Sequence, residues 1–143
     1  MGAGKSMEQL SSRQMEKPLT LPGSTEIIAV QSNPERHMGT MDITGKVVQN
    51  DYNKTVVGWV DATGQAYRND FNLTNVGRVD LSSGQIYSAN YNKTLLGRVD
   101  SDGNIYFSKD VVHASLQETV VGKLRGPKES YYFAACAFLT LWG

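Results

Sequence analysis

Val57-Gly-Trp-Val-Asp61 is a five-residue phrase that recurs, with small changes, along most of the chain. Related copies begin at Met38, Val76, Leu96 and Val121. Their glycines occupy positions 39, 58, 77, 97 and 122, so successive copies are 19, 19, 20 and 25 residues apart. Self-similarity at a period near twenty residues indicates one small supersecondary unit repeated along the chain.

Each copy of the phrase is followed by a turn that opens with aspartate and closes with glycine, as in Asp61-Ala-Thr-Gly64. Aspartate can accept a hydrogen bond from a backbone N–H two residues later, and glycine can adopt a positive φ. A short strand such as Gln65-Ala-Tyr67 comes next, and a second polar turn such as Asp51-Tyr-Asn-Lys54 separates the repeats. The pattern predicts an antiparallel series of short β-hairpins.

The apolar positions around each repeated glycine predict a bend in the strand. Val57 and Val60 are three residues apart, and a flat strand would place them on opposite faces. A bulge or kink at the glycine would allow both to be buried. We therefore expect kinks at Gly58, Gly77, Gly97 and Gly122 that close the hairpins around an axis.

The two ends of the chain differ from the repeats. Residues 1–22 lack a β pattern and are interpreted as a flexible N-terminal arm, and Glu26 to Val30 is predicted to be a strand. The apolar segment 129–142 is predicted to plug the hairpin array as a short helix, with a buried strand as the alternative. Residues 23–143 are thus expected to form one domain, with repeats near 38–56, 57–75, 76–95, 96–120 and 121–126.

The fold class predicted from these patterns is all-β, with four to five hairpin repeats of about twenty residues arranged about an axis. Two segments, Tyr91-Asn-Lys-Thr-Leu-Leu-Gly-Arg-Val-Asp100 and Asp102-Gly-Asn-Ile-Tyr106, are followed by an alanine-rich apolar C-terminus. In these features the chain resembles bacterial four-fold β-flower domains over residues 38–142. The resemblance implies hairpins arranged like petals, and it implies no catalytic residues.

Composition narrows the classes of partner. Fourteen basic and fourteen acidic residues give a formal net charge of zero, which argues against a nucleic-acid-binding face and against a polybasic membrane patch. A single cysteine, Cys136, excludes an internal disulfide and favours a reducing compartment. The polar N-terminus and the short apolar C-terminal segment predict neither a signal peptide nor a transmembrane segment. A cytoplasmic location is expected.

Four residues at one position of the repeated phrase form a candidate ligand rim: Trp59, Arg78, Arg98 and Lys123. If the repeats brought them together, the arginines could bind an anion through bidentate contacts. The alternative is that they are exposed positions on the polar face of each hairpin. The aspartates that open the turns are similarly expected to cap those turns, not to bind a metal ion.

The last repeat contains a longer loop, and longer loops are common places for function. Its candidate functional residues are Asp110, His113, Gln117 and Glu118.

The sequence favours a non-enzymatic structural or binding module without a cofactor or catalytic residues. Its partner is expected to be a protein or a small anionic ligand, and self-association is a further possibility. An alternative is carbohydrate recognition by the recurring aromatic residues, which an exposed aromatic ladder would favour. A small hydrolase would require His37 or His113 within hydrogen-bond reach of a serine or carboxylate.

Overall fold

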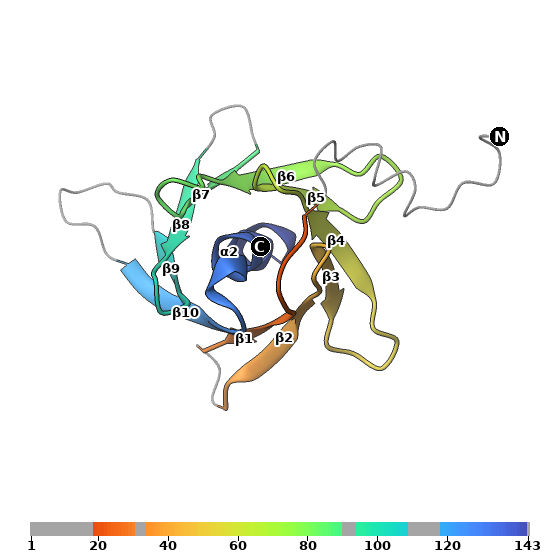
Figure 1. The fold of residues 1–143 in the computed structure, drawn as a ribbon, viewed down its shortest axis with the longest axis horizontal. Coiled ribbons are helices and arrows are strands. Elements are labelled where there is room, and N and C mark those ends of the chain that lie inside the picture. The colour runs from red at the N-terminus through yellow and green to blue at the C-terminus, as the bar shows by residue number, and fades with distance from the viewer. Residues whose placement is uncertain (1–18, 31–33, 90–93, 109–117, 143) are drawn as a thin grey trace.

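The computed structural model describes residues 19–30, 34–89, 94–108 and 118–142. Within these residues the chain forms a closed antiparallel barrel of ten strands around a central helix (Figure 1). The strands are β1 (Thr25–Ala29), β2 (Arg36–Met41), β3 (Lys46–Gln49), β4 (Val56–Val60), β5 (Gln65–Arg68), β6 (Asn75–Val79), β7 (Gln85–Ser88), β8 (Leu95–Val99), β9 (Asn104–Ser108) and β10 (Glu118–Arg125). A 3₁₀ turn, η1 (Lys128–Ser130), leads into the helix α2 (Tyr131–Leu141). The predicted all-β fold class is confirmed.

The strands pair in chain order, and β1 closes the barrel by pairing with both β2 and β10. Four hairpins are continuous in sequence: β2–β3, β4–β5, β6–β7 and β8–β9. The fifth two-strand unit joins the ends of the chain, because β10 carries the last copy of the repeated phrase and β1 lies beside it. The barrel is therefore built from five similar units, the fifth completed by the N-terminal strand.

The predicted bulges are present at the repeated glycines. Val47 pairs with Gly58 and Val48 pairs with Val56, so Val57 is the extra residue in β4. The register shifts at the corresponding place in the other copies, where the residues without a partner in the shifted pair are Met38, Val76, Leu96 and Val121. A bulge bends its strand and increases the local twist, and five bulges at a regular spacing favour closure of the sheet.

Helix α2 fills the interior of the barrel, as its position inside the ring of strands in Figure 1 shows. Ala134, Ala135, Cys136 and Ala137 have no exposed surface, which is expected of a helix that is apolar on all sides. The prediction of a helical plug is confirmed. Within the described residues, no helix has the length and apolar character needed to cross a membrane.

The glycines of the repeated phrase lie where strand backbone and helix side chains are closest. A Cβ atom on Gly58 would lie 2.7 Å from a Leu141 methyl carbon, and one on Gly97 would lie 2.9 Å from a Leu139 methyl carbon. Five glycines face five consecutive helix-end residues in this way: Gly122 and Phe138, Gly97 and Leu139, Gly77 and Thr140, Gly58 and Leu141, Gly39 and Trp142. The absence of Cβ atoms at these positions makes room for the helix.

The start of the packed chain differs from the sequence-based boundary. Leu19 and Leu21 are buried in the core, and the Leu21 N–H donates to the Ile43 carbonyl at 2.8 Å. The arm predicted to extend to residue 22 is therefore in contact with the barrel from Leu19 onward. Burial of these two leucine side chains stabilises the contact between this segment and the barrel.

The turn aspartates cap their own turns. Oδ1 of Asp61 accepts hydrogen bonds from the backbone N–H groups of Thr63 at 3.0 Å and Gln65 at 3.1 Å, and Gly64 closes the turn with φ +90°. Asp42 and Asp100 accept from equivalent pairs of backbone N–H groups. The described residues contain no group of three or more histidine, cysteine or acidic side chains placed to hold a metal ion.

Candidate functional site

The barrel end at which α2 terminates is hollowed, and we call it the C-terminal mouth. Its floor consists of side chains from the end of α2 and of the apolar bulge residues, and its outer edge consists of strand ends and the turns between repeats. The bulges therefore contribute to the floor of the mouth, because the apolar side chain of each bulge packs against the core.

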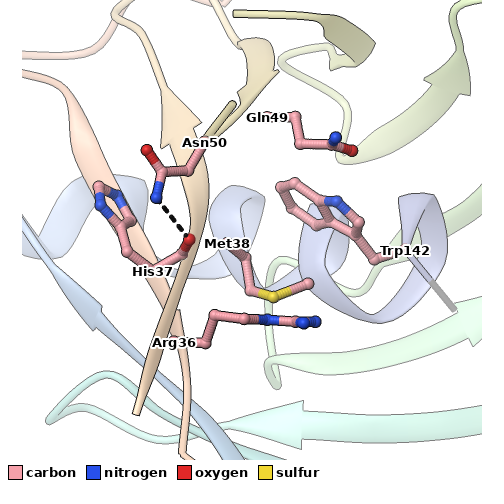
Figure 2. Close-up of a pocket in the computed structure, with 6 residues that line it drawn as sticks. All are labelled: Arg36, His37, Met38, Gln49, Asn50 and Trp142. Carbon is pink, nitrogen blue, oxygen red and sulfur yellow. Dashed lines mark hydrogen bonds between the residues drawn. The ribbon is translucent and has the colours of Figure 1, made fainter. Parts of the chain in front are cut away.

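One hollow at this mouth has a volume of about 460 Å³. It is lined by Arg36, His37, Met38, Gln49, Asn50 and Trp142. In Figure 2 the side chains of Arg36, Met38 and Gln49 extend to the side on which Trp142 lies, and His37 and Asn50 form the opposite wall. Apolar, cationic and amide groups thus face one space.

A neighbouring hollow of about 310 Å³ shares Arg36, Met38 and Trp142 with the first. Its other lining residues are mostly apolar: Ala29, Phe107, Val121, Phe138 and Leu139. We call the two hollows together the Trp142 groove. One part of the groove is rich in polar side chains and the other is predominantly apolar.

Hydrogen bonds to two backbone carbonyls and to one carboxylate orient the side chains of the polar wall of the Trp142 groove. Nε2 of His37 lies 3.0 Å from the carbonyl oxygen of Gly39, which can only accept, so this nitrogen carries the proton. Nδ2 of Asn50 donates to the carbonyl of His37 at 3.0 Å, and Nε2 of Gln49 donates to Asp51 at 3.1 Å. Each bond uses one of the two N–H donors of its amide and orients the amide, which leaves the side-chain oxygens of Gln49 and Asn50 as acceptors.

Arg36 is the cation of the groove. Its side chain is exposed, and no described residue forms a hydrogen bond or an ion pair with it. The preceding residue, Glu35, is instead paired with Lys123 at 3.0 Å. The positive charge at the mouth is therefore not neutralised by the acidic residue next to it in sequence.

The carboxylate nearest to the polar wall is occupied within its own turn. Asp51 accepts hydrogen bonds from the backbone N–H of Thr55 at 3.0 Å and from the Thr55 hydroxyl at 2.8 Å. The hydrogen bond from the Thr55 backbone N–H contributes most, and the bond from the Thr55 hydroxyl comes second, to holding the pKa of Asp51 below its ordinary value.

A third hollow, of about 390 Å³, lies elsewhere around the same mouth. Bulge residues Val76 and Leu96 and helix residues Leu139 and Thr140 line it, together with Arg68, Asn75, Ser88 and Ala89. It also places apolar side chains next to an arginine, but Arg68 occupies the repeat position of Gln49 and not that of Arg36.

The four residues of the predicted ligand rim do not converge. Trp59 lies between Gly58 and Val60, which face the helix, so its side chain is on the outer face of the barrel. There it packs with Tyr67 and Leu73. The other three residues occupy corresponding positions on β6, β8 and β10.

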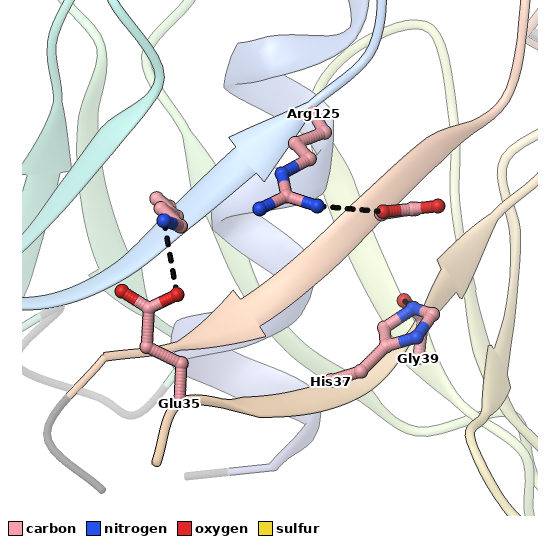
Figure 3. A network of polar contacts seen from close by, with 6 residues as sticks. Glu35, His37, Gly39 and Arg125 are labelled. Atoms are coloured by element: carbon pink, nitrogen blue, oxygen red, sulfur yellow. Dashed lines mark hydrogen bonds and ion pairs between the residues drawn. The ribbon is translucent and has the colours of Figure 1, made fainter. Parts of the chain in front are cut away.

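Each of the remaining rim residues has a neighbour on the outer face. The guanidinium carbons of Arg78 and Arg98 lie 4.8 and 4.1 Å from the ring centres of Tyr87 and Tyr106, in cation–π contact. Lys123 forms the ion pair with Glu35 (Figure 3). Trp59, Arg78, Arg98 and Lys123 are absent from the linings of the three hollows.

The predicted functional loop falls almost entirely outside the described residues. Asp110, His113 and Gln117 are not described, and for Glu118 the structure describes only its backbone position at the start of β10. His37, the other candidate histidine for a hydrolase, lies in the Trp142 groove with Nε2 bonded to a backbone carbonyl.

Sequence reasoning missed Arg36 and Trp142 as site residues. Arg36 precedes the first copy of the repeated phrase, and Trp142 lies at the end of the predicted apolar plug. The available signal was a large aromatic residue at the end of the plug, since tryptophan is amphipathic and often lies at the edge of a packed core.

Comparison of the chain with protein-family models, with curated proteins and with solved structures gave no match.

Proposed function

We propose that this protein is a non-enzymatic binding module whose binding surface is the C-terminal mouth of the barrel. The observation that carries the proposal is the Trp142 groove, two adjoining hollows that share Arg36, Met38 and Trp142. Helix α2 fills the barrel interior, which directs a ligand to the mouth. Pockets with apolar walls and a few oriented polar groups are typical of ligand sites, and barrel mouths are a common place for them.

The chemistry of the described nucleophiles supports binding over catalysis. Burial raises the pKa of the Cys136 thiol to about 12, so its reactive thiolate form is suppressed near neutral pH. His37 has one ring nitrogen engaged with a backbone carbonyl, an arrangement that orients the ring without activating a nucleophile. The neutral net charge supports a target other than nucleic acid.

A neutral fluorescent probe, N-phenyl-1-naphthylamine, tests binding at the mouth. The chain has two tryptophans, so Trp59→Phe leaves Trp142 as the single indole, and Trp142→Phe leaves Trp59. We expect saturable probe binding that quenches Trp142 emission in the Trp59→Phe protein by energy transfer, because the groove contacts Trp142. Quenching should be much weaker in the Trp142→Phe protein, whose indole lies on the outer face.

A variant within the groove completes the test. Met38→Lys places a charge at a position shared by both hollows, and we expect probe affinity to fall about tenfold, equivalent to about 1.4 kcal/mol. Lys128→Gln, an exposed change in the η1 turn before α2, serves as the control. Absence of saturable binding, or equal quenching in the two single-tryptophan proteins, would contradict the proposal.

A second candidate, carbohydrate recognition, is favoured by two aromatic side chains in the turns between repeats. Tyr52 is 99% exposed and Phe71 is 88% exposed, at equivalent positions in successive turns. Exposed aromatic faces can stack on the apolar faces of sugars. If this candidate holds, the Tyr52→Ala and Phe71→Ala substitutions should together abolish retention on an insoluble polysaccharide such as chitin, while Leu81→Ala, another exposed apolar residue, should not.

A further inference from the structure

We infer that the Trp142 groove selects a planar apolar group that carries one anionic substituent, such as an aryl carboxylate or sulfonate, and that Arg36 binds the anion. This inference rests on the proposed function, because it names the ligand class for the same mouth. In this inference the apolar part of the groove binds the planar group, and Arg36 in the polar part binds the anion.

The charge requirement follows from the surroundings of Arg36. No described residue pairs with this guanidinium, although Glu35 precedes it in sequence and Asp51 follows the lining residue Asn50. Glu35 is paired with Lys123, and the Asp51 carboxylate accepts hydrogen bonds from Thr55. A guanidinium presents several donors in a planar fork that matches a carboxylate or sulfonate. We therefore expect the Arg36 guanidinium to bind an anionic group of the ligand.

The preference for a planar apolar group follows from the other lining residues. Trp142 forms a wall common to both hollows, and Met38 lies between them. Phe138, Val121 and Leu139 extend the apolar part. Methionine adapts to ring edges and faces, and an indole offers an extended stacking surface. A flat hydrophobic ring satisfies these surfaces better than a small hydrated anion alone.

The end of α2 sets the orientation of such a ligand. The C-terminal carbonyl groups of a helix carry a partial negative charge, which repels an anion and attracts a donor or cation. The anionic substituent is therefore directed to Arg36, away from the end of α2 at Leu141. The acceptor oxygens of Gln49 and Asn50 remain for an N–H or O–H group on the ligand.

Two probes with the same aromatic frame isolate the charge requirement. 1-Anilinonaphthalene-8-sulfonate carries a sulfonate that N-phenyl-1-naphthylamine lacks. For the unaltered protein at low salt we expect the sulfonate to increase affinity about tenfold, and added salt should reduce the difference. Arg36→Gln should abolish the preference, because it should lower affinity for the sulfonate probe about tenfold more than affinity for the neutral probe.

The controls distinguish failure of this inference from failure of the proposed function. Arg125→Gln makes the same change on the outer face near the start of α2, where Arg125 lies 3.9 Å from Glu26, and should keep the preference (Figure 3). Equal affinity for the two probes, or loss of preference in Arg125→Gln as much as in Arg36→Gln, would overturn this inference and leave binding at the mouth intact. If neither probe binds in the unaltered protein, both the proposed function and this inference fail.

Discussion

Thr140 of α2 lies directly against Gly77 of β6. A Cβ atom at Gly77 would lie 2.5 Å from Cγ2 of Thr140 and 2.6 Å from the carbonyl oxygen of Tyr87. The Thr140 hydroxyl donates to the Cys136 carbonyl at 2.6 Å, which fixes its side chain against the barrel wall. Glycine at this position of the repeat is therefore required by the helix that fills the barrel as well as by the bulge.

Replacing Gly77 with alanine should destabilise the protein. Both atoms that would meet the new methyl group are held in place, so we expect the free energy of unfolding to fall by about 2 kcal/mol or more, as for overpacked cores. Urea unfolding followed by circular dichroism measures the change. Gly23→Ala is the control, because its Cβ would meet only Pro127 at 3.5 Å and should change stability little. Equal midpoints for the two variants would show that the approach of helix and strand is not tight.

The turns between repeats offer a stabilising substitution. Lys54 is an exposed residue with φ +52°, a left-handed conformation that costs a residue with a Cβ about 1–2 kcal/mol. Glycine avoids that cost but loses more conformational entropy on folding, by about 0.5–1 kcal/mol. We therefore expect Lys54→Gly to raise the free energy of unfolding by about 0.5 kcal/mol, seen as a higher urea midpoint.

The equivalent residue of the next turn gives a matched comparison. Leu73 has φ +50°, but its side chain is buried with Trp59 and Tyr67. Leu73→Gly relieves the same backbone conformation and removes a buried leucine side chain worth about 2–3 kcal/mol, so it should be destabilising. A gain in stability for Leu73→Gly would mean that the outer cluster contributes little.

The repeated phrase predicted the bulges and the closure, and the apolar C-terminal segment predicted the plug, because each depends on a local pattern. An apolar pair three residues apart around a glycine can be buried on one side only through a bulge, and the structure has that bulge at Val57 and Gly58. An uninterrupted apolar segment near the C-terminus had to be enclosed, and α2 is enclosed by the strands.

The candidate site depends on relations that a local pattern does not contain. Arg36 and Trp142 belong to no repeated position, and they meet only because α2 ends at the mouth beside β2. The four residues of the predicted ligand rim do not converge, although they do share one position of the repeated phrase. Equivalent positions in a closed array, such as those of Arg78 and Arg98, lie on separate hairpins and face outward, so recurrence in sequence does not bring them together.

Acid should weaken the turns between repeats. The Asp70 carboxylate accepts from the Thr74 backbone N–H and hydroxyl, and these bonds hold its pKa below the ordinary value. A lowered folded-state pKa stabilises the native state above the unfolded pKa of about 3.9, and the contribution is lost as the pH falls through the folded-state pKa. Asp70→Asn should therefore be less stable than the unaltered protein at about pH 6, and the difference should shrink towards about pH 2 to 3.

Urea midpoints across this pH range measure the effect for Asp70→Asn. Asp102→Asn is the control, because it removes one negative charge from a turn in which no described group donates a hydrogen bond to that carboxylate. Its midpoint should run parallel to that of the unaltered protein. A constant difference between Asp70→Asn and the unaltered protein at all pH values would show that ionisation of Asp70 does not contribute.

The single cysteine should report on opening of the barrel. Cys136 is fully buried in α2, with its thiol directed to the Gly64 carbonyl at 3.7 Å, and burial raises its pKa to about 12. An aromatic disulfide reagent at about pH 8 should react readily with an ordinary thiol of pKa about 8.5, but not with Cys136 in the folded protein. We expect a labelling rate that is independent of reagent concentration at high reagent concentration and that increases with urea, because unfolding limits the rate.

A Cys136→Ala protein carrying Ser101→Cys, at an exposed turn position, should instead react at once. Rapid labelling of Cys136 without urea, in proportion to reagent, would mean that α2 leaves the barrel while the strands remain paired.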